Sequence, residues 1–144
     1  MSKFVYKLVT SDVELPEALE VRRQVFVREQ GISEYLVFDV HDKESLHVLV
    51  KDRESVIGTA RIQFLADNQA KLERMAVLKR YRHKGIGREM LRFLDTIWKN
   101  KNVQQVIIHA QFEVVPFYKS CGFNELGSPF QEAGIKHIKM QKQV

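Results

Sequence analysis

The sequence predicts an α/β (α+β) fold built on one mixed sheet. Three observations predict it. Short segments of alternating or continuously apolar residues recur along the chain, as β-strands require. Two longer segments repeat apolar residues at the 3.6-residue period of an amphipathic helix. The second of these helices lies between two strand segments, which predicts a β-α-β crossover and at least one parallel strand pair.

The first expected elements are a strand over Lys3–Val9 and a helix from about residue 14 to Arg28. The strand segment alternates loosely between apolar and polar residues. Ser11 and Asp12 offer an N-cap to the helix, apolar residues recur through it at helical spacing, and Gly31 ends it.

Three strands joined by short turns follow. They are expected over Leu46–Val50, Ser55–Leu65 and Ala70–Leu78. The charged residues 51–54 suit a hairpin turn, and the polar residues 66–69 turn the chain again. These segments predict an antiparallel meander.

The apolar spacing then becomes helical over Gly85–Lys99, where seven residues share one face: Ile86, Met90, Leu91, Phe93, Leu94, Ile97 and Trp98. A buried strand is expected over Val103–Ala110, and a short helix from Pro116 to Ser120. Two final strands, around Phe123–Leu126 and Ile135–Met140, complete the order β-α-β-β-β-α-β-α-β-β.

Length and composition bound what the chain is. A chain of 144 residues and 16.9 kDa, with 44% hydrophobic and 28% charged residues, predicts a single globular domain over 1–144 and excludes wholesale disorder. The one cysteine, Cys121, excludes an intramolecular disulfide and a cysteine-cluster zinc site. No apolar run is long enough for a membrane span, and the N-terminus lacks an apolar targeting segment, so we expect a cytoplasmic protein without a membrane partner.

The formal net charge of +5 is concentrated in one segment. Six Lys and Arg residues lie between Lys79 and Arg92 and are opposed only by Glu89, whereas the other charges of the chain balance. The segment contains two glycines, Gly85 and Gly87, immediately before the second helix. Backbone N–H groups at a helix N-terminus bind phosphate, and glycine lets the phosphate approach the backbone. The segment therefore predicts a pyrophosphate site.

Two common phosphate motifs are absent. The chain has no Walker pattern, and the dinucleotide pattern G-x-G-x-x-G fails at Met90. What remains is R-x-x-G-x-G, formed by Arg82, Gly85 and Gly87. Taken alone, this hexapeptide is as compatible with a flexible glycine-containing turn whose basic side chains face solvent as it is with a pyrophosphate site.

A second motif, Phe117-Tyr118-Lys119-Ser120-Cys121-Gly122-Phe123, begins 30 residues after Gly87. Together the two motifs, with the preceding strand Leu72–Val77, resemble the GNAT superfamily of acyl-CoA-dependent N-acyltransferases. The resemblance covers essentially the whole chain. It implies a mostly antiparallel sheet of six to seven strands, helices on both faces and a central β-α-β crossover.

A narrower resemblance is to a small bacterial subgroup of acetyltransferases whose natural substrates are poorly defined. Its marks here are Val21–Gly31, the residues Asp39, Asp42 and His47, the tripeptide His109-Ala110-Gln111, and Glu132–Met140.

The family resemblance implies acetyl-CoA as co-substrate. The pantetheine arm would run beside Met75, Ala76 and Val77 and pair with their backbone, and the Val77 amide would polarise the thioester carbonyl. The pyrophosphate would lie on the backbone amides of Arg82, His83, Lys84, Gly85, Ile86, Gly87 and Arg88. Gln111 stands where many members carry Asn, and its amide would hold the pantetheine or a water. Phe117 and Tyr118 complete the expected cofactor residues.

Tyr118 matches the family tyrosine that protonates or hydrogen-bonds the leaving sulfur. The alternative is an aromatic residue packed on the core. Glu73 is the candidate base, because alternation along the strand would place it on the face of Met75 and Val77, beside the cofactor. The alternative is an ion pair with Arg61 or Arg74.

The acceptor is expected to contact the first helix and its exit, through Arg22, Phe26, Glu29 and Gln30. His109 ends a buried strand near the active centre and is the best placed of the histidines, but core or rim packing is the simpler interpretation of each. No histidine has zinc-site spacing, so no metal is expected. Cys121 is expected to be a small buried thiol rather than a nucleophile.

Three functions remain open. The first is an N-acetyltransferase that moves the acetyl group of acetyl-CoA to a primary amine of a small molecule or peptide. The second is a non-catalytic acyl-CoA sensor. The third, a nucleic-acid-binding module, is disfavoured because the basic residues cluster around two glycines without an aromatic platform. A homodimer is compatible with the family.

Overall fold

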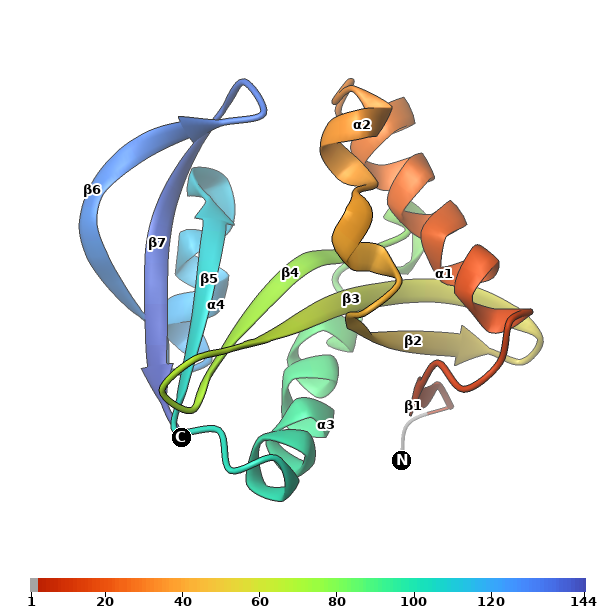
Figure 1. The fold of residues 1–144 in the computed structure, drawn as a ribbon. Helices are drawn as coiled ribbons and strands as arrows, with labels where there is room; N and C mark the ends of the chain where they lie inside the picture. Colours follow the sequence, from red (N-terminus) through yellow and green to blue (C-terminus); the bar gives the residue numbers. More distant parts are fainter. Residues whose placement is uncertain (1–2) are drawn as a thin grey trace.

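A computed structural model describes residues 3–144, which form one seven-stranded sheet in the order β1-β2-β3-β4-β5-β7-β6 (Figure 1). Only β4 and β5 pair in parallel, and the other five neighbouring pairs are antiparallel. Helices α1 and α2 cover one face, and α3 and α4 cover the other (Figure 1). The structure confirms the predicted α/β (α+β) fold, its mixed sheet and its crossover. The strands are β1 Val5–Leu8, β2 Leu46–Asp52, β3 Ser55–Leu65, β4 Gln69–Val77, β5 Gln105–Gln111, β6 Asn124–Glu132 and β7 Ile135–Gln143.

The helical elements are α1 Glu14–Arg22, the π-helix η1 Arg23–Glu29, α2 Glu34–Val37, α3 Ile86–Asn100 and α4 Val115–Ser120, with short 3-10 helices η2 Val40–Asp42, η3 Lys79–Tyr81 and η4 Phe112–Val114. The helix predicted from about residue 14 to Arg28 is thus α-helical only as far as Arg22. Its continuation has the wider π form, which shifts side chains round the axis. No element was expected where α2 and η2 lie, because helices of three or four residues are too short to show a period.

Strand β6 is longer than predicted and runs to Glu132. Nearly all of its residues are exposed, so its sequence lacks the alternation that marks a half-buried strand. Its backbone is fixed by pairing with β7 along the edge of the sheet.

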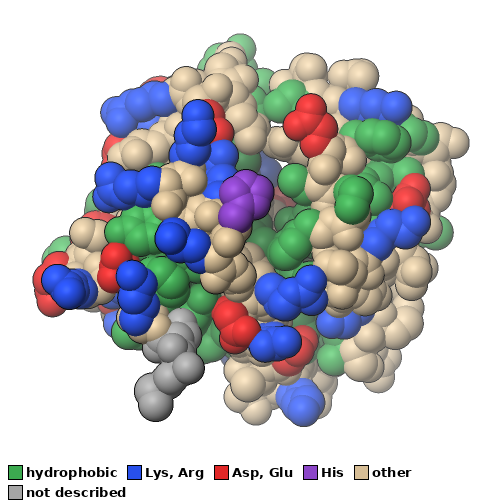
Figure 2. All heavy atoms as spheres, turned by 180° about the vertical axis from the view of Figure 1, so that it is seen from behind, with side chains coloured by type: hydrophobic (Ala, Val, Ile, Leu, Met, Phe, Trp, Pro, Cys, Tyr) green, Lys and Arg blue, Asp and Glu red, His purple; other side chains and the backbone are tan. Residues whose placement is uncertain are grey.

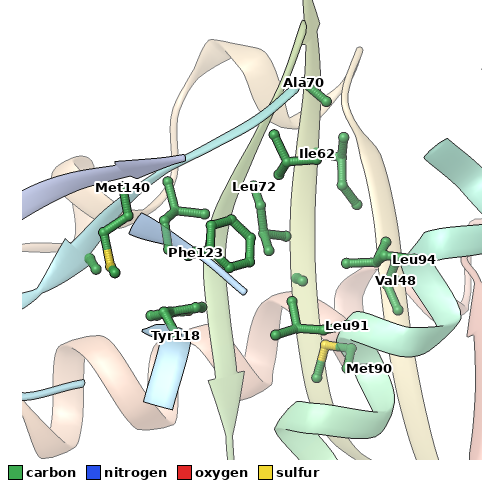
Figure 3. Close-up of a cluster of buried hydrophobic side chains, with 14 of the residues drawn as sticks. Val48, Ile62, Ala70, Leu72, Met90, Leu91, Leu94, Tyr118, Phe123 and Met140 are labelled. Carbon is green, nitrogen blue, oxygen red and sulfur yellow. The ribbon is translucent and has the colours of Figure 1, made fainter. Parts of the chain in front are cut away.

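The main core lies between the sheet and α3. Met90, Leu91 and Leu94 of α3 point at Val48, Ile62 and Leu72 of the sheet, and Tyr118 and Phe123 extend this cluster (Figure 3). A smaller cluster lies under the first helix on the opposite face and contains Val21, Val25, Phe26, Val37 and Ala76.

A bulge in β4 changes which face its residues present. The pairing of β3 with β4 shifts register, and Arg74 has a left-handed φ of 53°. Beyond the bulge, Met75 and Val77 pack against the α3 cluster. Glu73 faces the α1 side, where it meets Arg61. The prediction that Glu73 shares a face with Met75 and Val77 is therefore wrong, because the extra residue interrupts the alternation.

Strands β4 and β5 separate half-way along their length. Their pairing runs from Gln69 opposite Gln105 to Leu72 opposite Ile108 and then ends. The next residues, Glu73 and His109, begin the two diverging arms. Because Leu72 and Ile108 face the α3 cluster, Glu73 and His109 both face the α1 side.

Candidate functional site

The separation of β4 from β5 opens a cavity of about 1100 Å³. One wall is β4 from Lys71 to Val77, and the other is β5 with the β6–β7 turn. The end of η1 and helix α2 line it on the α1 side. Seen from the face that α3 and α4 cover, the molecule is hollowed near its centre, with Lys and Arg side chains along one edge of the hollow (Figure 2).

Most of the predicted site residues lie on this cavity. Its walls include Met75, Ala76, Val77, Arg82, Gln111, Phe117 and Tyr118 of the expected cofactor set, the candidate base Glu73, and Phe26, Glu29, Gln30 and His109 of the expected acceptor set. The sequence therefore predicted a group of residues that the fold brings together from η1, β4, β5 and α4 and from the segments that follow η1 and η3.

The glycine segment, residues 82–87, lies between β4 and α3 and includes the first two residues of α3. His83 and Gly85 both have left-handed φ angles, of 63° and 80°, and α3 begins directly afterwards at Ile86. The N–H groups of the first turn of this 15-residue helix have no partner within the helix, and its dipole favours an anion there. The Ile86 side chain is buried, so Ile86 offers a ligand only its backbone.

Gly87 lies in the first turn of α3 and is needed for packing. A Cβ atom at Gly87 would lie 3.0 Å from Cζ of Phe117 and 3.4 Å from Cε of Met75. The two motifs of the sequence therefore meet here, since Phe117 of the second motif packs against the glycine of the first. Lys84, Gly85 and Arg88 do not line the cavity between β4 and β5. They line a separate, smaller cavity of about 510 Å³.

Arg82 is held by a carboxylate from the first helical segment. Its Nη1 and Nη2 lie 2.6 and 2.8 Å from the two carboxylate oxygens of Glu29, and its Nε donates to the Val77 carbonyl at 2.9 Å. The bonds from Arg82 lower the pKa of Glu29. The same region is joined a second time, because Nε2 of Gln111 donates to Oε1 of Gln30 at 2.8 Å.

Tyr118, the candidate acid, contacts the expected cofactor strand β4: its hydroxyl lies 3.9 Å from Sδ of Met75. The residue is 9% exposed, and its ring stands edge-on to Phe117 and Phe123. Burial, with a smaller contribution from Cys121, raises the pKa of Tyr118. Its phenol is therefore protonated at neutral pH and able to donate a proton.

Glu73 lies in a network of buried charges. Its carboxylate is 3.0 Å from Nη2 of Arg61 and 3.4 Å from Nζ of Lys71, and it also accepts from Gln63. Burial raises the pKa of Glu73, but Gln63 and the cations Arg61, Lys71 and Arg74 outweigh burial and lower it. The ion pair with Arg61 and Arg74 that the sequence left open is thus present.

Arg61 is the centre of this network. It is 1% exposed and bonds Asp39 at 2.6 Å and Asp42 at 2.9 Å as well as Glu73. Burial lowers the pKa of Arg61, yet Asp39, Glu73 and Asp42 together raise it. The sequence marked Asp39 and Asp42 as features of a subgroup and assigned them no role, because nothing in their spacing shows that they meet an arginine on a distant strand.

Arg22 does not contact the acceptor side, and that prediction is wrong. The side chain is fully buried, donates to the Val37 carbonyl and lies 2.7 Å from Asp42. Arg22 therefore lies beneath η2, and its bonds to Val37 and Asp42 hold the segment from α2 to η2 in place. Burial lowers the pKa of Arg22, and Asp42 opposes that effect.

His109 faces the cavity and bonds a carboxylate from β6. Its Nδ1 lies 3.1 Å from Oε1 of Glu132, and its ring stands edge-on to Phe130 at 5.1 Å. His137 lies nearby, with Nδ1 2.7 Å from the Ile135 carbonyl and Nε2 3.8 Å from Glu132. No role was predicted for Glu132, because the residues of this exposed strand show no periodic pattern.

Within residues 3–144, no group of three or more His, Cys, Asp or Glu side chains is arranged to hold a metal ion. In the same part of the chain, no helix is long and apolar enough to cross a membrane. Cys121 is partly buried and forms no disulfide.

Comparisons with known proteins agree with this fold. A family model described as an acetyltransferase (GNAT) domain matches residues 11–144. The uncharacterised N-acetyltransferase YjcF of Bacillus subtilis is 35% identical over 136 residues, which is 94% of this chain and 96% of YjcF.

Two solved structures show the same fold. One, assigned to the N-acetyltransferases of Lactobacillus plantarum, superposes with a TM-score of 0.91 at 27% identity, over 97% of each chain. The other is a GNAT family acetyltransferase from Elizabethkingia anophelis with acetyl-CoA bound. It covers 100% of both chains with a TM-score of 0.79, and at 16% identity the likeness is one of fold alone.

Proposed function

Because this chain belongs to the GNAT family of acetyltransferases, we propose that it transfers the acetyl group of acetyl-CoA to a primary amine of a small molecule or peptide by direct attack on the thioester. One observation carries the proposal: one cavity between β4 and β5 is lined by Arg82, by Phe117 and Met75 that pack against Gly87, by Tyr118 and by the acceptor walls.

The cofactor occupies the α3 side of the cavity in this proposal. The N-terminus of α3, with Arg82 and the amides of His83 to Arg88, takes the pyrophosphate. The separated arm of β4 leaves the backbone of Met75, Ala76 and Val77 without a partner on β5. The pantetheine amides supply that partner, as an added strand would.

The reaction needs a polarised carbonyl and a proton for the departing sulfur. The Val77 amide polarises the thioester oxygen. The amine nitrogen attacks the carbonyl carbon, a C–N bond forms, and the C–S bond breaks. Tyr118 then donates its phenolic proton to the thiolate of CoA, and its raised pKa keeps the phenol protonated until that step.

The acceptor enters from the α1 side, past Phe26, Gln30 and the arms that begin at Glu73 and His109. In this proposal the ionised Glu73 attracts the cationic form of the amine, and it remains a candidate base acting through a water. Its lowered pKa makes it a weak proton acceptor. The proposal places the reaction in the cytoplasm.

Calorimetry and a thiol-release assay together test the proposal. Calorimetric titration with acetyl-CoA at high micromolar concentration is expected to show binding, and titration with duplex DNA is expected to show none. Thiol release is then followed with spermidine, tyramine, glucosamine and a lysine-containing tripeptide. Binding without CoA release for any amine would favour the acyl-CoA sensor, and absence of acetyl-CoA binding would exclude both functions.

A further inference from the structure

We infer that His109, oriented by Glu132, is the general base that takes the proton of the attacking amine. This inference rests on the proposed function, because it names the proton acceptor of the same reaction. It starts from the position of His109, the first residue of β5 beyond its last parallel pair with β4. Its side chain lines the cavity.

Acid and base lie on opposite faces of the separated strands. Tyr118 belongs to the cluster on the α3 face, whereas His109 faces the α1 side, because its neighbours Ile108 and Ala110 are buried in that cluster. Direct attack brings the amine in on one side of the carbonyl carbon and releases sulfur on another. A phenol on the cofactor face and an imidazole on the acceptor face match those two proton transfers.

The bond to Glu132 fixes the tautomer of the imidazole. An ionised carboxylate only accepts, so the 3.1 Å contact assigns the proton of the neutral ring to Nδ1 and leaves the lone pair on Nε2. Glu132 belongs to β6, on the side of β5 away from β4. Nε2 is therefore on the side of the ring toward the diverging arm of β4. The edge-on contact with Phe130 restricts rotation of the ring.

His137 helps to hold Glu132 in place. Its Nδ1 donates to the Ile135 carbonyl, its ring stacks on Phe130, and its Nε2 lies 3.8 Å from Oε2 of Glu132. The charged and titratable groups around His109 are Glu132 of β6, Lys136, His137 and Lys139 of β7, Lys71, Glu73 and Arg74 of β4, Glu29 of η1, Arg82, Glu113 of η4 and Tyr118 of α4.

The contrast with Glu73 decides between the two candidates. Oε1 of Glu73 accepts from Arg61 and Gln63, and Oε2 lies 3.4 Å from Nζ of Lys71 and 3.7 Å from Nη1 of Arg74. These cations stabilise the ionised carboxylate and so weaken it as a proton acceptor. In this inference the amine N–H proton passes to Nε2 of His109 as the C–N bond forms. Tyr118 protonates the thiolate, and solvent returns the proton from the imidazolium to the phenolate, so protons balance over one turnover.

The test compares pH profiles of kcat/KM with acetyl-CoA and the best amine of the panel above. His109→Gln is expected to lower kcat by about 10²- to 10³-fold and to abolish the acidic limb, as loss of a general base does. Glu132→Gln removes a charge that stabilises the imidazolium, so the acidic limb should move to lower pH by up to about one unit. Glu73→Gln should keep the wild-type limb.

Two matched controls accompany these variants. His41→Gln changes an exposed histidine paired with Glu44, and Glu125→Gln changes another carboxylate of β6, paired with Lys119. Both should leave the profile unchanged. Calorimetric binding of acetyl-CoA should stay within about twofold of wild type in every variant, which separates loss of the base from loss of the fold.

Nitrogen chemical shifts of the imidazole rings give a readout apart from activity. Proton–nitrogen correlation spectra should show His109 as the Nδ1–H tautomer, and Glu132→Gln should change that signal. An acidic limb that survives in His109→Gln and vanishes in Glu73→Gln would overturn the inference while leaving the proposed function intact. An Nε2–H tautomer of His109 would also overturn it. A wild-type protein that acetylates no amine would contradict the proposed function and the inference together.

Discussion

Glu29 and Arg82 form a bidentate ion pair, with nitrogen–oxygen distances of 2.6 and 2.8 Å. The pair links the end of η1 to the segment that leads into α3. The pair joins the acceptor side of the cavity to the expected pyrophosphate site. Because both Nη atoms of Arg82 already donate to Glu29, fewer N–H donors are free for a phosphate. The pyrophosphate of the cofactor and Glu29 therefore compete for Arg82.

Glu29→Gln should therefore tighten acetyl-CoA binding. The side chains are about one-third exposed, and an exposed pair of this kind contributes about 0.2–1 kcal/mol, so the Kd should fall by roughly 1.5- to 5-fold. Calorimetry at low salt measures it, with Glu34→Gln as control because that carboxylate pairs with Arg23. An unchanged or higher Kd would show that Arg82 does not bind the pyrophosphate.

Tyr118→Phe should slow turnover and leave acetyl-CoA affinity nearly intact. The variant removes the proton donor for the leaving thiolate, and the buried ring still packs against Phe117 and Phe123. Loss of a general acid lowers kcat by about 10²-fold or more. Steady-state kinetics at saturating substrates measure it. Equal kcat for the two proteins would remove Tyr118 from the mechanism.

Gly87→Ala should weaken acetyl-CoA binding, although the intrinsic helix propensity of alanine exceeds that of glycine by about 1 kcal/mol. The added Cβ would lie 3.0 Å from Cζ of Phe117 and displace a ring that lines the cavity. The Kd should rise several-fold. Gly127→Ala is the control, since its Cβ meets nothing within 4 Å and its left-handed φ of 78° costs stability only. If both variants keep wild-type affinity, the packing of Gly87 on Phe117 has no part in binding.

Arg61→Leu should destabilise the protein by about 3–5 kcal/mol, because it leaves the carboxylates of Asp39, Asp42 and Glu73 without their common cation. Urea unfolding at pH 7 measures the change. Arg92→Leu, which breaks an exposed pair with Glu89, should stay within about 0.5 kcal/mol of wild type. A similar small effect for Arg61→Leu would contradict the central place of Arg61.

Acid should unfold the protein partly through Asp42. Burial raises its pKa, but Arg22, the Asp39 backbone and Arg61 lower it from 3.8 to about 2. A carboxyl with a lower pKa in the folded state stabilises fully above its unfolded pKa, and this contribution disappears as the pH falls from about 4 through 2. Asp42→Asn should flatten the decline in unfolding free energy between pH 4 and 2, followed by urea titrations. A slope equal to that of wild type would exclude Asp42 as a source of the acid sensitivity.

The sequence predicted the elements whose residues repeat with a clear period. The meander, the helix now seen as α3 and the buried strand β5 all present an apolar face to one core, and their positions agree with the structure. The family resemblance assigned Gly87 and Phe117 of the two motifs to one cofactor site, and in the structure the two residues pack against each other.

Features that depend on contacts between distant segments could not be predicted. The bulge at Arg74 reverses the face of Glu73, and no periodic pattern signals one inserted residue. Arg22 sits on a helix that was expected to face the acceptor, yet its partners Val37 and Asp42 belong to short helices without a period. Glu132 meets His109 only because β6 returns along the sheet edge.

The most direct test of acetyl transfer combines two measurements on the wild-type protein with acetyl-CoA and the amine panel. One is the release of CoA thiol, and the other is mass spectrometry of the amine. The account predicts one acetylated amine for each CoA released, with both products reduced about 10²-fold or more in Tyr118→Phe. Tight binding of acetyl-CoA with no acetylated amine from any member of the panel, or equal product from wild type and Tyr118→Phe, would contradict it.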